Sequence, residues 1–176
     1  NDLLIEEEDY DTLRVSIDAY DNFDALALAS RLTEHELLEF RRVAAHLYRK
    51  NDRFDDSISL SKADSLFRDA IETASHSGVP EVAEELLEYF VDTGNKECYA
   101  AMLFACYDLL APDFVMEVSW RHALSDFTMP YQIQQARDTR TKLLALEKEV
   151  RERAAKDSAK EKEYLDTPIL GPGAFA

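Results

Sequence analysis

Apolar residues recur at helical spacing along most of the chain. In residues 36–50, for example, Leu37, Phe40, Val43 and Leu47 fall on one face of a helix, and polar residues occupy the rest. The same periodicity predicts helices over residues 10–20, 23–32, 36–50, 53–61, 64–75, 81–92 and 96–110. The hydrophobic pattern therefore predicts an all-α fold.

Residues that end and begin helices divide this series into pairs. Gly78 follows one predicted helix and Pro80 opens the next, where a missing N–H costs nothing. Asp64 is placed to cap the N-terminus of the helix over residues 64–75. Pairing the helices gives units over residues 23–50, 53–77 and 81–110. Short connections between amphipathic helices of this length predict an α-solenoid of helical hairpins.

The pattern changes after residue 112. A helix is expected over residues 113–125, with Met116, Trp120, Ala123 and Phe127 spaced 4, 3 and 4 residues apart, as in the contact stripe of a coiled coil. Pro130 predicts a kink or a new helix start. The spacing continues beyond it, but Arg140 and Glu147 occupy two of the stripe positions, so only a weak coiled coil is expected there.

The charge is strongly acidic and unevenly distributed. The formal net charge is −16, and residues 1–95 carry 23 acidic and 9 basic side chains. This balance argues against nucleic-acid binding, which needs clustered Lys and Arg. No apolar run is long enough to span a membrane, and the acidic start lacks the basic residues of a signal peptide. Because the chain also begins without Met inside a helical pattern, we expect a fragment of a longer protein.

Candidate catalytic and metal-binding motifs are incomplete. His35 and Glu36 resemble the first half of an HExxH zinc motif, but the second His is absent. Cys98 and Cys106 are too far apart on one predicted helix to form a disulfide, and they lack C-x-x-C spacing. A phosphate-binding glycine loop and a G-x-S-x-G motif are also missing. We therefore expect neither an enzyme nor a bound cofactor or metal.

Residues 96–131 stand out by composition. They contain the only Trp, both Cys, all three Met and six of the seventeen Phe and Tyr residues. One interpretation is that these side chains pack against the hairpins of their own chain. The other is that they form an interface, since large contiguous apolar patches mark interaction sites.

Residues 96–131 also resemble the part of the clathrin heavy chain family that joins three legs into a triskelion. The resemblance includes residues 7–54, 64–74 and 83–90, together with 106–110 and 120–131. It covers roughly the first 135 residues and fades after Gln135. It implies hairpins of the proximal leg over residues 1–111, a trimerisation helix over 112–135, a charged helical extension over 136–164 and a disordered tail over 165–176.

The function implied by this resemblance is structural. The chain would be the hub of a homotrimer in the polyhedral coat of vesicles, on the cytoplasmic face of coated pits and coated vesicles, without direct membrane insertion. Its partners would be clathrin light chain and neighbouring triskelia. The implied trimer-interface residues are Phe114, Met116, Trp120, Ala123, Phe127, Met129, Tyr131 and Ile133. The implied light-chain contacts are Cys98, Met102, Cys106 and Tyr107.

An alternative from another class is a monomeric helical-repeat scaffold that grips peptides in its concave face. The two interpretations differ in solution mass, because only the first predicts a trimer. An enzyme is the least favoured interpretation.

Overall fold

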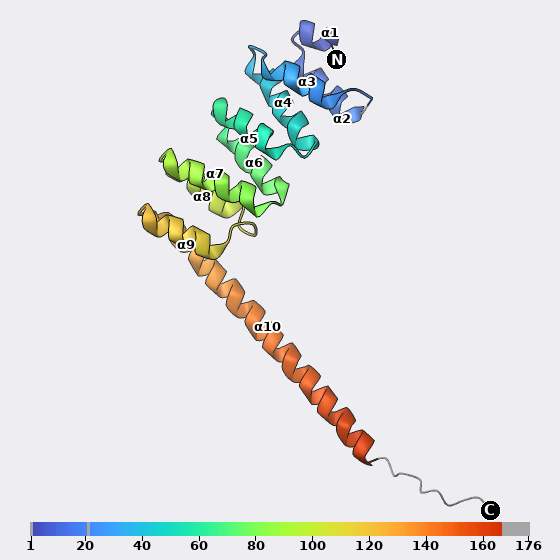
Figure 1. Ribbon diagram of the computed structural model, residues 1–176, viewed down its shortest axis with the longest axis vertical. Helices are drawn as coiled ribbons and strands as arrows, with labels where there is room; N and C mark the ends of the chain where they lie inside the picture. Colours follow the sequence, from blue (N-terminus) through green and yellow to red (C-terminus); the bar gives the residue numbers. More distant parts are fainter. Residues whose placement is uncertain (1, 21, 167–176) are drawn as a thin grey trace, which may run out of the picture. The chain divides into compact units, whose positions relative to one another are not determined.

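The computed structural model describes residues 2–20 and 22–166, and its regular elements over these residues are all α-helices (Figure 1). The helices are α1 (Asp2–Glu6), α2 (Tyr10–Ala19), α3 (Ala25–Thr33), α4 (Leu38–Lys50), α5 (Phe54–Ala63), α6 (Phe67–Ser77), α7 (Pro80–Asp92), α8 (Lys96–Ala105), α9 (Pro112–Arg121) and α10 (Ser125–Asp166). The predicted all-α solenoid is confirmed. Of the tail predicted to be disordered, Leu165 and Asp166 are the last residues of α10, and the remainder lies outside the described residues.

The chain divides into two units, residues 1–131 and residues 132–176. In the first unit, consecutive helices from α3 to α8 pack against one another as a stack of antiparallel hairpins, as Figure 1 shows. The second unit is the part of α10 that follows Tyr131. None of the side chains described from residue 132 to 159 is buried.

Five turns of the first unit share one hydrogen-bonding geometry. A residue with positive φ follows the helix, and the next N–H bonds to the carbonyl five residues earlier. The positive-φ residues are Glu8, Asp52, Ser65, Gly94 and Ala123. The corresponding bonds are Asp9 N–H to Leu4 O, Arg53 to Tyr48, Leu66 to Ser61, Asn95 to Phe90 and Leu124 to Ser119, at 2.8–2.9 Å. The α9–α10 connection is therefore a turn of the same kind as those within the hairpins.

This turn divides residues 112–135, the segment that the resemblance implies to be a trimerisation helix, between two helices. The helix stops at Arg121 and restarts at Ser125, because Ala123 adopts a φ of 55°. The alternative of a new helix start at Pro130 is wrong, since α10 continues through that residue. Pro130 lies close to the start of α10, so its missing N–H removes only the bond to the Asp126 carbonyl.

The ends of α6 show one prediction confirmed and one contradicted. Gly78 follows the helix in the left-handed conformation and Pro80 is the first residue of α7, as predicted. Asp64, in contrast, is the C-cap of α5, and Leu66 is the residue before α6. The Asp64 carboxylate instead accepts hydrogen bonds from Arg41 Nε at 2.9 and 3.0 Å.

The first unit contains two apolar cores. The first is built by α2, α3 and α4 around Leu13, Ile17 and Phe40, all of which are fully buried. The second runs from Ile58 in α5 to Tyr131 in α10 and includes Phe90, Tyr99 and Met102. The first core ends at α4 and the second begins at α5, so α4 also faces the helices of the next core.

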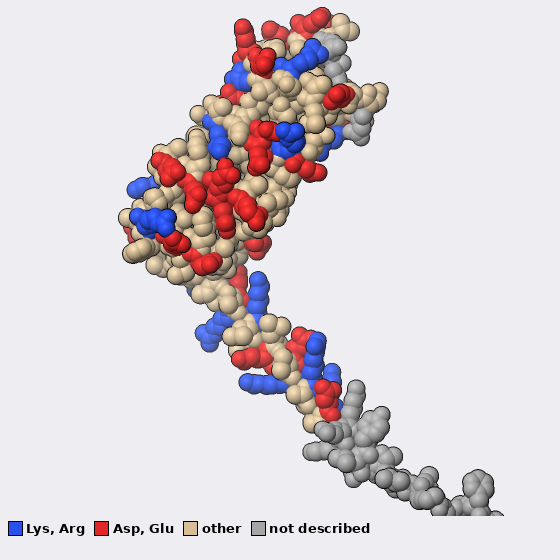
Figure 2. Space-filling model, in the orientation of Figure 1, with Lys and Arg blue, Asp and Glu red and all other residues tan. Residues whose placement is uncertain are grey.

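Between the two cores, α4 meets α5 and α6 through charged side chains. Arg41 pairs with Asp64 at 2.9 Å, Arg42 with Asp69 at 2.8 Å and Arg49 with Glu72 at 3.1 Å. Hydrogen bonding to these carboxylates raises the pKa of both Arg41 and Arg42. Acidic residues dominate α7, which contains several Glu and no basic residue, and acidic side chains gather on this part of the surface in Figure 2.

Candidate interaction surface at the α9–α10 turn

Helix α8 and the connection that follows it are joined to the first turns of α10 by buried hydrogen bonds. The hydroxyls of Tyr99 and Thr128 lie 2.7 Å apart, and both residues are fully buried. Tyr131 donates its hydroxyl proton to the Leu110 carbonyl at 3.0 Å, and its ring packs edge-on against Tyr107 at 5.4 Å. These contacts hold the start of α10 against the last hairpin.

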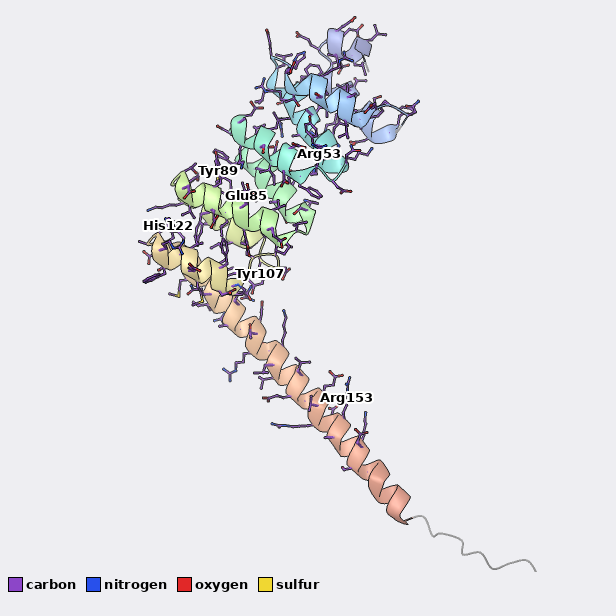
Figure 3. The ribbon with its side chains drawn as sticks, viewed as in Figure 1. Arg53, Glu85, Tyr89, Tyr107, His122 and Arg153 are labelled. Carbon is purple, nitrogen blue, oxygen red and sulfur yellow. The ribbon has the colours of Figure 1, made fainter. Side chains whose placement is uncertain are left out.

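Helix α9 is placed by its own apolar pattern. Val115 and Val118 are buried in the second core, and Pro112 opens the helix. Tyr107 lies in the connection that precedes α9 and His122 is its C-cap, so the two labels in Figure 3 mark the ends of this helix. The face opposite Val115 and Val118 is left to solvent.

Large apolar side chains are exposed on this face and on the neighbouring turns. Trp120 is 82% exposed, Met116 54%, Met129 49% and Phe127 42%. Phe104, near the end of α8, is 89% exposed. We call the first four of these residues, which lie on α9 and at the start of α10, the apolar surface. Large exposed apolar groups close together mark sites of protein association, so this surface is the candidate functional site.

The structure separates the eight predicted trimer-interface residues into three groups. Met116, Trp120, Phe127 and Met129 belong to the apolar surface, and Ala123 is exposed in the turn between them. Ile133 is exposed in the second unit, and Phe114 is half-buried against the second core. Tyr131 was expected at the interface, but only 6% of it is exposed. Its hydroxyl bonds to the Leu110 carbonyl and its ring packs against Tyr107.

Two of the four predicted light-chain contacts are wrong. Met102 and Cys106 are buried in the second core, so they cannot contact a partner directly. Cys98 and Tyr107 are only half-buried. Phe104 was missed, although the sequence carried a signal for it. Residues 98–107 are apolar around the whole helix, and a helix that packs on one side cannot bury every face.

The chemistry of this region is that of packing. Burial raises the pKa of the Cys106 thiol to about 11, and burial also raises the pKa of Cys98. Both thiols are therefore protonated at neutral pH and poor nucleophiles. Within residues 2–20 and 22–166, the structure contains no group of three or more His, Cys, Asp or Glu side chains that could hold a metal. None of the described helices combines the length and apolarity that a membrane span requires.

A stack of antiparallel helical hairpins followed by a long helix places the chain in the α-solenoid class of repeat proteins. Residues 1–98 match the model of a region found in clathrin and VPS proteins. This match covers more than half of the chain, so the chain belongs to the clathrin and VPS repeat family.

The most similar curated relatives include clathrin heavy chains from distant organisms. The chain is 53% identical over 172 residues to the probable clathrin heavy chain of Schizosaccharomyces pombe, which covers 97% of the chain. It is 48% identical to the clathrin heavy chain of Dictyostelium discoideum over 98% of its length, and 47% identical to the human clathrin heavy chain 2 over 96%. The chain spans 10% of the length of each relative. The alignment covers 172 residues, so the similarity extends beyond residue 135. A similarity confined to roughly the first 135 residues was expected.

Proposed function

We propose that this chain is the trimerising hub segment of a clathrin-type coat, at the end of the proximal leg. Three copies would meet around a three-fold axis through the apolar surface, giving a vertex from which three legs extend. Neighbouring triskelia would pack against the hairpins to form the polyhedral lattice. The hub would act on the cytoplasmic face of coated pits and vesicles in endocytosis and intracellular transport.

The observation that carries this proposal is the exposure of Trp120 in a chain related to clathrin heavy chains. A Trp that is 82% exposed places a large apolar ring in water, and burying it in an interface is favourable. Aromatic residues are also the side chains that most often dominate the free energy of association. The ammonium group of Lys96 lies 5.9 Å from the centre of the Phe127 ring.

We propose that clathrin light chain reaches the hub beside α8. Cys98 on α8 and Tyr107 just after it are half-buried, so part of each side chain is accessible. Phe104, also on α8, is exposed and offers an apolar contact. Met102 and Cys106 would support these residues from the core rather than touch the partner. Titrating light chain onto the chain and onto Phe104→Ala tests this assignment, and equal affinities would contradict it.

The experiment that tests trimerisation is mass measurement in solution. Light scattering over a range of micromolar concentrations should give three times the chain mass of 20.1 kDa. A monomer mass over the whole range would contradict the hub and favour a scaffold that binds peptides.

A further inference from the structure

A polar cavity of about 90 Å³ lies where α2, α4, α5 and α6 meet, between the two apolar cores. Its lining residues come from all four helices: Arg14, Arg42, Ala45, His46, Arg49, Ser57, Ser61, Asp69, Glu72 and Thr73. One water needs only about 10–15 Å³ of such space. The cavity therefore has room for a polyatomic ligand.

Arginine donors surround this cavity. Arg42 is held by Asp69 and Glu39, and Arg49 donates to Glu72 and to His46 Nδ1. These two bonds use only two of the five N–H donors of the Arg49 guanidinium. Among the described residues Arg14 has no hydrogen-bond or ion-pair partner, although Asp18 is near enough to feel its charge.

The acidic residues of the lining are already paired. Asp69 is neutralised by Arg42 at 2.8 Å and Glu72 by Arg49 at 3.1 Å. His46 accepts from Arg49 at Nδ1, so its Nε2 carries the proton that is donated to Asp18 at 2.8 Å. The lining itself contains three Arg and two carboxylates, and the carboxylates of Glu39 and Asp18 lie near Arg42 and Arg14 outside it.

A buried hydroxyl in the wall lacks a partner. Ser57 is 1% exposed, and its Oγ has no hydrogen-bond partner among the described residues. The other two hydroxyls of the lining are satisfied, Ser61 by the Ser57 carbonyl and Thr73 by the Asp69 carbonyl. Buried polar groups are almost always hydrogen-bonded, so the Ser57 hydroxyl is available to bond to a group in the cavity that it lines.

We propose that this cavity binds a phosphate group, either as free phosphate or as a phosphomonoester carried by a partner protein. Arginine guanidinium groups bind phosphate through paired, charge-assisted hydrogen bonds. Arg14 and Arg49 supply the unused N–H donors at the mouth, and the Ser57 hydroxyl donates from the wall. The site lies in the hairpins rather than on the apolar surface, so its occupancy does not depend on the proposed trimer.

Calorimetric titration of the full chain with inorganic phosphate, at constant ionic strength set by chloride, tests the proposal. Saturable binding is expected, and Arg14→Gln and Arg49→Gln should each weaken it about tenfold or more. The matched control is Arg68→Gln, an exposed arginine of α6 outside the lining, which should change the affinity less than twofold. Equal losses in Arg14→Gln and Arg68→Gln would overturn the site, because they would show a general effect of charge.

Ser57→Ala separates binding from folding. Removing an unpartnered hydroxyl should leave the melting temperature unchanged or raise it, while phosphate affinity falls several-fold. Ser59→Ala, on the exposed side of the same helix, should change neither. A parallel titration with a phosphoserine peptide identifies the source: tighter binding than inorganic phosphate means a partner-borne group, and equal binding means free phosphate. Absence of saturable binding to both probes would overturn the proposal and leave water as the occupant.

Discussion

The middle hairpins and the α9–α10 turn differ in the exposure of their large apolar side chains. Between residues 39 and 103, all of which are described, no large apolar side chain is exposed. From Phe104 to Met129 five of them are exposed, although the same stretch buries Val115, Val118 and Leu124. In the middle hairpins, neighbouring helices therefore cover the large apolar side chains. At the α9–α10 turn they cover those on the inner face and leave those on the outer face exposed.

This difference has a physical origin in the repeat. Each helix of a solenoid packs on the helices before and after it, so apolar residues on both sides are covered. Helix α9 packs on the hairpin that precedes it, and the element that follows it among the described residues is the long helix α10. The side of α9 that would have met a following hairpin is the side that carries Met116 and Trp120. Exposure of apolar residues at the end of a solenoid is the condition for another chain to complete the packing.

The largest expected effect is a loss of folding stability when a buried side chain of the middle hairpins is removed. Phe90 is fully buried and contacts the rings of Phe67 and Tyr89. Phe90→Ala should lower the free energy of unfolding by about 3–5 kcal/mol, through lost burial and the cavity left behind. Phe104→Ala makes the same chemical change at an exposed position and should cost less than about 0.5 kcal/mol. Urea denaturation of both variants measures the contrast, and similar losses would show that Phe104 is covered in solution.

A substitution on the apolar surface should change the stability of the proposed trimer rather than the stability of the folded chain. Trp120→Ala should weaken the proposed trimer by about 2–4 kcal/mol, the cost of removing a central aromatic residue from an interface. The melting temperature of the dilute single chain should stay nearly constant, because Trp120 is exposed there.

Leu144→Ala is the matched control for Trp120→Ala, since Leu144 is an exposed apolar residue of the second unit. It should leave the mass unchanged. Light scattering that finds an unaltered trimer for Trp120→Ala at micromolar concentration would remove Trp120 from the interface.

A smaller effect is expected at the turn that separates α9 from α10. Ala123 has a φ of 55°, a conformation that glycine adopts without steric cost. Ala123→Gly should therefore raise the free energy of unfolding by up to about 1 kcal/mol. Ala101→Gly, inside α8, should lower it by about 1 kcal/mol. If thermal unfolding shows both variants destabilised, the left-handed turn at Ala123 is absent in solution.

Ala123 also shows why the sequence predicts the hairpins well and the turn poorly. The hairpin α6–α7 is bounded by Gly78 and Pro80, whose backbone preferences are visible in the sequence. Four of the six positive-φ positions are occupied by residues other than glycine, and Ala123 is one of them. An alanine in the midst of a helical pattern gives no sign of a turn, so the pattern predicted a break at Pro130 instead of between Arg121 and Ser125.

The errors at Asp64, Tyr131 and Met102 have a second cause. Spacing shows which residues share a face of a helix, but not whether that face meets its own chain or a partner. Asp64 pairs with Arg41, which lies 23 positions earlier, and Tyr131 bonds to Leu110, 21 positions earlier. Such long-range contacts come from the stacking of hairpins. Met116 and Trp120 are exposed on the face of α9 opposite the buried Val115 and Val118, and their place in a trimer interface stays a prediction.

The second unit should contribute least to association. Its exposed residues Leu144 and Val150 are separated by the charged residues Glu147, Lys148 and Glu149, and its ion pairs lie on the surface of one helix. Such pairs, for example Glu149 with Arg153 at 2.6 Å, stabilise a helix by about 0.2–0.5 kcal/mol each. These ion pairs therefore stabilise α10 as a helix but contribute nothing to association between chains.

Ending the chain after Leu146 should therefore leave the trimer mass at three times that of the shortened chain, with a dissociation constant within a fewfold of the original. Ending it after Pro112 should give a monomer, because that cut removes Trp120 and the rest of α9. Sedimentation of the two shortened chains beside full-length Trp120→Ala distinguishes the two regions. If the cut after Leu146 alone produced monomers while Trp120→Ala remained trimeric, the second unit would be the oligomerisation element. The exposed face of α9 would then need another partner, since its apolar residues would still lack cover.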